Sequence, residues 1–253
     1  MRTLFTALAL ALSVPALAGT IDLTTADGVQ IGATTYGSGD NGVVLIHGNG
    51  RDAEDWSHFG ERLATRGFHV VAVDLRGHGH SAAAAELTAA TYPLMVADVD
   101  AATAWLRANG AAKVHLVGAE FGANLAVISA AADTEINDIA LLSAGMNLQG
   151  VASPTAMETY GARPALVIAS AGDSYSARSA TVLEGKAAGP VYVEILDGEA
   201  KGVRMLTRDP QLEGKLIAWL NGTYDLDGRR GGRTVTTEAG EDVETSGVRF
   251  GDQ

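Results

Sequence analysis

The chain has 253 residues, which suits one α/β domain with a sizeable core, and it carries a formal net charge of −12. This acidic balance excludes nucleic acid as an expected partner, because phosphate binding requires a basic face. The absence of cysteine excludes disulfides and thiolate chemistry.

The first 18 residues have the three parts of a secretory signal peptide. Arg2 precedes the apolar run Leu4–Val14, and the step from Ala16 to Ala18 predicts cleavage before Gly19. About eleven apolar residues are too few to cross ~30 Å of hydrocarbon, so a transmembrane anchor is not expected. We therefore predict a periplasmic or secreted protein with no membrane span after signal cleavage at Ala18.

Strands and helices are expected to alternate along the chain. A hairpin is predicted for Thr20–Thr24 and Val29–Tyr36, and buried strands for 43–46, 70–73, 114–117, 139–142, 165–169 and 191–196. Helical spacing of apolar residues predicts helices over 53–66, 95–108, 123–132 and 210–220. This alternation predicts an α/β fold with a mostly parallel, doubly wound sheet flanked by helices, in one domain over residues 19–224.

The last part of the chain, residues 225–253, has a different composition. It begins with a charged, glycine-rich stretch and continues as a polar sequence with few apolar anchors. Such a segment buries too little apolar surface to offset the entropy of ordering, so it predicts a flexible polar tail.

A sharp turn from strand to helix is expected at Gly118-Ala119-Glu120-Phe121-Gly122. Gly-x-Ser-x-Gly in this setting holds a nucleophilic serine at the top of a parallel sheet. Here Glu120 takes the serine position. All six histidines also precede this turn, so a Ser…Asp…His triad in that chain order lacks its first and last members.

Three segments together resemble the α/β-hydrolase family, close to its small, lidless esterase or serine-aminopeptidase-like members. His47-Gly48-Asn49-Gly50 ends an expected strand, as the family's oxyanion loop does. The run from Asp74 to Ser81 fits the family's Asp-x-Arg-Gly-x-Gly-x-Ser turn, and the Glu120 turn is the third segment. The resemblance covers about residues 20–222. It implies an α/β-hydrolase fold with a minimal lid and no cofactor.

The resemblance also assigns the triad positions. Asp173 follows the strand that usually precedes the triad acid, and Lys201 stands where the family has its histidine. The amides of Asn49 and Phe121 would form the oxyanion hole. Two carboxylates beside a lysine keep it charged, which predicts a Glu120–Lys201–Asp173 ion-pair chain.

Several side chains near these positions have simpler expected roles. His47 is expected to orient its loop, and Asp74 and Arg76 to brace their turn by a salt bridge and local hydrogen bonds. No histidine spacing favours a metal site. The segment where this family inserts lids holds only about twenty residues, between the strands predicted over 139–142 and 165–169. We therefore expect a shallow, open pocket, lined by His47, Met146, Met157 and Tyr160.

Two functional hypotheses follow from the exchanged triad positions. The first is an exported hydrolase-like protein without Ser-His-Asp catalysis, a pseudoenzyme retained as a binding or structural module with a small-molecule or peptide ligand. The second is a hydrolase of ester, amide or related bonds that uses Glu120 as nucleophile or general base. A protein-interaction surface on the tail is a third possibility, and the sequence leaves the oligomeric state open.

Overall fold

The computed structural model describes residues 18–82, 86–224 and 234–235. The predicted signal peptide, apart from its last residue, lies outside the described residues, as does most of the predicted tail.

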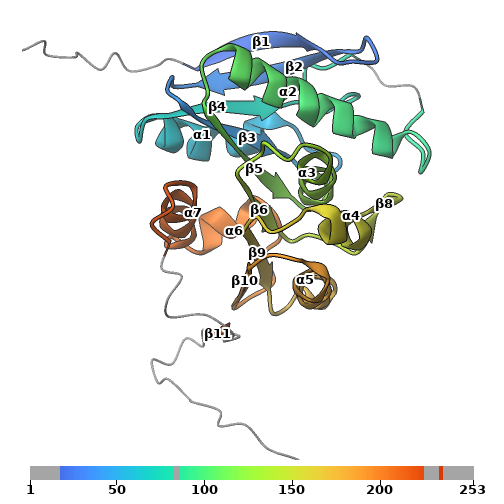
Figure 1. Ribbon diagram of the computed structural model, residues 1–253, viewed down its shortest axis with the longest axis vertical. Coiled ribbons are helices and arrows are strands. Elements are labelled where there is room, and N and C mark those ends of the chain that lie inside the picture. The colour runs from blue at the N-terminus through green and yellow to red at the C-terminus, as the bar shows by residue number, and fades with distance from the viewer. Residues whose placement is uncertain (1–17, 83–85, 225–233, 236–253) are drawn as a thin grey trace, which may run out of the picture.

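A nine-stranded sheet forms the centre of the described structure (Figure 1). Its strands are parallel to their neighbours except that β2 runs antiparallel to β1 and β4. In spatial order they are β1 (Gly19–Thr24), β2 (Gln30–Tyr36), β4 (Phe68–Val73), β3 (Asn41–Ile46), β5 (Lys113–Ala119), β6 (Asp138–Leu142), β9 (Ala165–Ser170), β10 (Val191–Leu196) and β11 (Thr234–Val235).

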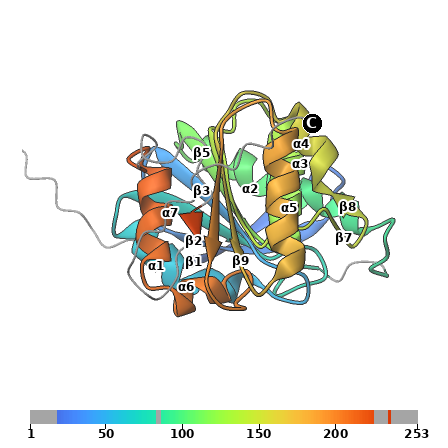
Figure 2. The ribbon, with the colours of Figure 1, turned by 90° about the horizontal axis from the view of Figure 1, so that it is seen from below.

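Helices cover both faces of this sheet, as the view in Figure 2 shows. One face carries α2 (Val96–Ala108), α3 (Phe121–Ala132), α4 (Ser153–Thr159) and α5 (Ser174–Lys186). The other carries α1 (Ser57–Ala64), α6 (Arg204–Arg208) and α7 (Leu212–Leu220). None of the helices in the described ranges has the length and hydropathy of a membrane span.

The central strands are apolar on both sides because each side meets a helical layer. In β3, Val44 and Ile46 join the core under α2 and α3, while Val43 and Leu45 join the core under α1 and α7. All four side chains are fully buried. This alternation is the period of two that a strand imposes on its side chains.

The predicted strands and the doubly wound parallel sheet are confirmed. Sequence reasoning missed α5, a short hairpin of β7 (Asn147–Leu148) with β8 (Val151–Ala152), and the five-residue helix α6. The α5 segment is rich in serine and threonine and shows no strong apolar stripe. The start of α5 could have been recognised from its N-cap, because Asp173 accepts the Ser176 N–H there.

Two residues of the predicted tail belong to the sheet. Thr234 pairs with Glu194 and Val235 pairs with Ile195, so β11 runs parallel to β10 at the edge of the sheet. The other residues of 225–253 lie outside the described residues, and the flexible tail stays a prediction.

Candidate active site

The carboxyl ends of the parallel strands lie at one edge of the sheet, and the candidate site is built from the loops there. The turn between β5 and α3 places Glu120 at φ 51° and ψ −115°. A positive φ is unfavourable for a residue with a Cβ, and such strain is found mostly at functional sites. The chain thus keeps the strained backbone of a nucleophile turn with glutamate in place of serine.

Two glycines make this turn possible. A Cβ on Gly118 would lie 2.4 Å from the Gly122 carbonyl oxygen, and a Cβ on Gly122 would lie 2.4 Å from the His47 carbonyl oxygen. Both contacts are with rigid backbone, so neither position admits a larger residue. The tight packing of α3 against β3 and β5 therefore depends on both glycines.

The Glu120 side chain is half-buried between two loops. A Cβ on Gly48 would lie 3.0 Å from Glu120 Oε2, and a Cβ on Gly202 would lie 3.2 Å from Oε1. The carboxylate therefore occupies space that the two glycines leave open. Within the described ranges it has no hydrogen bond and no ion pair within 4.0 Å.

Asp173 and Lys201 meet at the next two loops along the sheet. Lys201 Nζ lies 3.0 Å from Asp173 Oδ1, which also accepts the Ser176 N–H at 3.4 Å. Burial raises the pKa of the Asp173 carboxyl, but hydrogen bonds from Ser176 and Lys201 outweigh burial and hold the pKa below its ordinary value. Asp173 Oδ2 is buried and has no partner among the described residues.

Of the two contacts in the predicted Glu120–Lys201–Asp173 chain, only the ion pair between Lys201 and Asp173 forms. Gly202, rather than Lys201, lies against the Glu120 carboxylate, so the loop passes Glu120 with its backbone. The lysine instead pairs with the more deeply buried Asp173. The Glu120 carboxylate also has a weak electrostatic interaction with Arg51. The pKa of the Arg51 guanidinium is raised mainly by Asp55, and Glu120 makes the smallest contribution.

Two backbone amides beside Glu120 are available to a ligand. The N–H groups of Asn49 and Phe121, which the resemblance assigns to an oxyanion hole, have no acceptor in the described part of the chain. Phe121 is the first residue of α3, where N–H groups carry the positive end of the helix dipole. The arrangement therefore retains donors suited to a carbonyl or anionic oxygen.

His47 orients its loop, as predicted from the sequence. The Leu75 N–H donates to His47 Nε2 at 3.0 Å, so the ring proton sits on Nδ1, which donates to the Gly48 carbonyl at 2.7 Å. Burial lowers the pKa of His47 to about 4, which keeps the ring neutral near pH 7. Both ring nitrogens are occupied, so His47 cannot serve as a general base.

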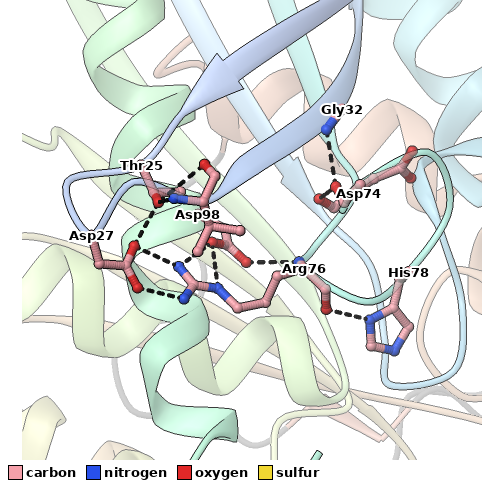
Figure 3. Close-up of polar contacts among 9 residues, drawn as sticks. Thr25, Asp27, Gly32, Asp74, Arg76, His78 and Asp98 are labelled. Atoms are coloured by element: carbon pink, nitrogen blue, oxygen red, sulfur yellow. Dashed lines mark hydrogen bonds and ion pairs between the residues drawn. The ribbon is translucent and has the colours of Figure 1, made fainter. Parts of the chain in front are cut away.

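His78 holds the same loop from the opposite side. The Gly50 N–H donates to His78 Nε2 at 3.1 Å, and His78 Nδ1 donates to the Arg76 carbonyl at 3.1 Å. Figure 3 shows His78 turned toward the Arg76 backbone. This ring therefore also has both nitrogens engaged.

Arg76 binds two carboxylates that sequence reasoning missed (Figure 3). Its guanidinium lies 2.6 Å from Asp98 Oδ1 and 2.6 Å from Asp27 Oδ2, and its backbone N–H donates to Asp98 Oδ2 at 2.8 Å. The predicted salt bridge between Asp74 and Arg76 is wrong, whereas the predicted local hydrogen bonds of this turn are confirmed at Asp74. Asp27 and Asp98 lie 49 and 22 residues from Arg76 in sequence, and no local pattern identifies them.

Asp74 instead ties together three backbone segments. Its Oδ1 accepts the Ala53 N–H at 2.7 Å, and its Oδ2 accepts the His80 N–H at 2.9 Å. Its own N–H donates to the Gly32 carbonyl at 2.9 Å. Asp74 therefore fixes the turn relative to β2 and the short segment that precedes α1.

The predicted pocket residues are not exposed together. Met157 and Tyr160 are 0% and 1% exposed and belong to the hydrophobic core, so neither can line an open pocket. Tyr160 also donates to the Pro164 carbonyl at 2.8 Å. His47 is buried as well, and Met146 alone of the four is partly exposed. Among the described residues, no three His, Asp or Glu side chains are grouped as metal ligands.

Comparison with known proteins identifies the scaffold. A sequence model of the alpha/beta hydrolase fold family matches residues 41–171. An esterase from Pyrococcus furiosus is similar in structure, with a TM-score of 0.69 and 18% identity over 83% of this chain and 92% of that chain. An esterase from Exiguobacterium antarcticum has a TM-score of 0.63 and 16% identity over 79% of this chain and 98% of its own. At these identities the likeness shows the fold alone.

A short sequence match points to the same scaffold. The chain is 48% identical over 54 residues to a pimeloyl-[acyl-carrier protein] methyl ester esterase of Sodalis glossinidius (strain morsitans). The match covers 21% of each protein, so the chain spans about a fifth of the length of this curated relative.

Proposed function

The chain belongs to the α/β-hydrolase fold family, and from that premise we propose that it is an exported member without Ser-His-Asp catalysis, retained as a binding module for a small molecule or peptide. The observation that carries this proposal is the 3.0 Å ion pair between Lys201 and Asp173. By the resemblance, these two residues stand where the family holds its histidine against its acid.

Acyl transfer needs a base with a free lone pair to take a proton from the nucleophile or from water. The amine of Lys201 is engaged by the Asp173 carboxylate at 3.0 Å, and an ammonium has no such lone pair. The two described histidines beside the oxyanion loop, His47 and His78, have both ring nitrogens engaged. These contacts support a catalytically silent site.

The same site retains groups that can bind. Asn49 and Phe121 offer backbone N–H groups, and the Glu120 carboxylate offers an acceptor that is not paired within the described residues. This combination suits a ligand with a carbonyl or anionic oxygen next to an amine or hydroxyl group.

An activity assay tests the proposal. The purified mature chain is compared with a Glu120→Ala variant on short-chain nitrophenyl esters and on amino-acid arylamides. We expect the two proteins to show the same background rate. Turnover by the wild type clearly above that of Glu120→Ala would refute the proposal.

A second candidate function is hydrolysis with Glu120 as nucleophile or general base. Two observations favour it: the strained Glu120 backbone and the unoccupied oxyanion amides. It predicts that Glu120→Gln abolishes activity, and that a trapped substrate adds mass to the peptide that carries Glu120. A Glu120→Gln variant with the full rate would eliminate this candidate.

Export rests on the sequence of the first 18 residues, and we propose that residues 19–224 form the mature domain. Expression of the full chain in a bacterial host, followed by mass spectrometry of the periplasmic fraction, tests this. A mature N-terminus at Gly19 is expected, and an uncleaved chain in the cytoplasm would contradict it.

A further inference from the structure

Ser143 directly follows β6, at the edge of the sheet that holds the candidate site. It is 2% exposed, and its backbone has a φ of 55°. Its N–H donates to the Ile168 carbonyl of the neighbouring strand β9 at 2.8 Å, which fixes this backbone in place. Glycine would adopt a positive φ without strain. A serine in this conformation, beside a candidate site, therefore points to a use for its hydroxyl.

The backbone around Ser143 contacts the loops that carry two of the site residues. The Glu120 N–H donates to the Leu142 carbonyl, directly before Ser143, at 2.8 Å. The Ser176 hydroxyl donates to the Ser143 carbonyl at 3.3 Å, and the Ser176 N–H donates to Asp173 Oδ1 at 3.4 Å. This backbone therefore joins the Glu120 turn to the start of α5, whichever side chain stands at position 143.

The hydroxyl of Ser143 binds the third loop, which carries Lys201. Ser143 Oγ accepts the Gly202 N–H at 3.0 Å and donates to Met205 Sδ at 3.3 Å, and both contacts are buried. The single proton of the hydroxyl is thus used on the sulfur, and a lone pair is used on the amide. Because Met205 lies in the first turn of α6, the hydroxyl fixes both the end of the Lys201 loop and the start of this helix.

The position of Gly202 determines which group faces Glu120. A Cβ on Gly202 would lie 3.1 Å from Glu120 Cγ and 3.2 Å from Oε1, so the Gly202 backbone packs against this side chain. Lys201 comes one residue earlier in the loop, and its Nζ lies 3.0 Å from Asp173 Oδ1. The Glu120 carboxylate is consequently left without an ion pair among the described residues.

Loss of the Ser143 hydroxyl would leave the Gly202 N–H without its acceptor in the protein interior. A buried N–H without a partner is unfavourable, so the loop is expected to rearrange until the N–H finds one. The Glu120 carboxylate beside Gly202 is an acceptor that has no other hydrogen bond within the described ranges. The loop should therefore shift toward Glu120 and draw Lys201 away from Asp173.

We propose that Ser143 is a positioning residue of the candidate site. By holding the Gly202 N–H, its hydroxyl keeps Lys201 paired with Asp173. It also leaves the Glu120 carboxylate free, and the use of this carboxylate for a ligand rests on the proposed function. The position of Lys201 can be measured without a ligand, so the role of Ser143 is tested separately from that function.

Competitive acylation with acetic anhydride, followed by mass spectrometry of the peptides, measures the position of Lys201. The reagent modifies an accessible free amine, so labelling of Lys201 should rise when the amine leaves Asp173. Lys186 is the internal reference, because its side chain is also 47% exposed and is paired with Glu158.

Two variants remove the hydroxyl in different ways. Ser143→Gly also relieves the strain of the positive φ, whereas Ser143→Ala keeps it. Ser129→Ala is the matched control, because Ser129 is equally buried and donates to Asp100 Oδ1 at 2.6 Å, between α3 and α2. Circular dichroism and thermal unfolding verify that the variants fold.

We expect the labelling ratio of Lys201 to Lys186 to rise about three- to tenfold in both Ser143 variants, as the loss of one partly exposed ion pair would give. The ratio should stay at the wild-type value in Ser129→Ala. An unchanged ratio in a folded Ser143→Gly variant would overturn the proposal. An equal rise in Ser129→Ala would also overturn it, because it would show a general loosening of the fold.

The variant Asp173→Asn tests whether Ser143 acts through the ion pair. It should raise the same labelling ratio of Lys201, and the addition of Ser143→Gly should then raise it little further. Two independent effects that multiply in the double variant would show that Ser143 does not act through Asp173, and would refute the assigned role.

Discussion

The rings of His47 and His78 lie 5.2 Å apart, and each accepts a backbone N–H from the loop of the other. Leu75 donates to His47, and Gly50 donates to His78. This reciprocal pair joins the oxyanion loop to the Asp74–Ser81 turn. Both histidines therefore fix the position of the loop that carries Asn49 and its amide.

The buried His47 predicts a loss of stability in mild acid. Its pKa is lowered from 6.5 to about 4 in the folded chain, mainly by burial. Between these values the unfolded state binds a proton that the folded state does not, so the free energy of unfolding falls as the pH falls from about 6.5 to 4. A shift of this size corresponds to about 3 kcal/mol.

Urea unfolding at pH 7, 5.5 and 4.5 measures this effect. His47→Gln is expected to be less stable at pH 7 but to show a smaller pH dependence than the wild type. His58→Gln is the control, because the His58 side chain is 73% exposed, and it should keep the wild-type slope. Identical slopes for the wild type and His47→Gln would show that His47 is not the titrating group.

The ion pair between Lys201 and Asp173 is expected to stabilise the fold. Lys201→Met removes the cation from a buried carboxylate, and because the lysine is half-exposed we expect a loss of about 1–2 kcal/mol in the free energy of unfolding. The control is Lys186→Met, which breaks a pair with Glu158 in which both side chains are 47% exposed. That loss should stay below about 0.5 kcal/mol. Equal losses in urea unfolding would contradict the assigned burial of Asp173.

Two glycine substitutions in helices should have opposite effects. Gly122→Ala places a Cβ 2.4 Å from the His47 carbonyl oxygen and 2.5 Å from that of Ile46, so we expect a loss of about 3 kcal/mol or more. Gly185→Ala on α5 meets no atom within 4 Å and should gain about 0.5 kcal/mol from helix propensity. Thermal unfolding of both variants measures this. A well-tolerated Gly122→Ala would mean that the turn is looser than described.

Arg163 is predicted to be irreplaceable by lysine. Its guanidinium donates to the carbonyls of Ala130, Asp133, Ile136 and Tyr160, and it stacks over the Tyr160 ring at 4.3 Å. Lysine cannot reproduce this planar set of donors, so Arg163→Lys should cost about 2 kcal/mol. Arg178→Lys, at an exposed position on α5, should cost less than about 0.5 kcal/mol. Similar losses for the two variants would argue against the assigned contacts.

The sequence was sufficient to predict the parallel sheet and the Glu120 turn. Continuous apolar runs such as Val43–Ile46 identify strands buried on both faces, and glycines at 118 and 122 identify a close strand–helix approach. The pairing of Lys201 with Asp173 was implied by the resemblance to the α/β-hydrolase family, and in the fold the two residues lie in the loops that follow the neighbouring parallel strands β9 and β10.

Contacts between distant segments could not be predicted in the same way. The sequence pattern offered Arg76 one neighbouring carboxylate, Asp74, whereas the fold supplies Asp27 from a hairpin and Asp98 from a helix. Glu120 is separated from Lys201 because the loop places the backbone of Gly202, and not the lysine side chain, against the carboxylate. Such details are set by loop conformation, which no residue pattern specifies.

The restoration of a triad tests the central claim most directly. A Glu120→Ser, Lys201→His variant combines a hydroxyl on the strained turn with an imidazole beside Asp173, under the free amides of Asn49 and Phe121. Its rate on a short-chain nitrophenyl ester is measured beside the wild type and beside the same variant with Asp173→Asn. We predict background rates for the wild type and the Asp173→Asn variant, and a clearly higher rate for the double variant. A wild-type rate at or above that of the double variant, lost on Glu120→Gln, would contradict the account.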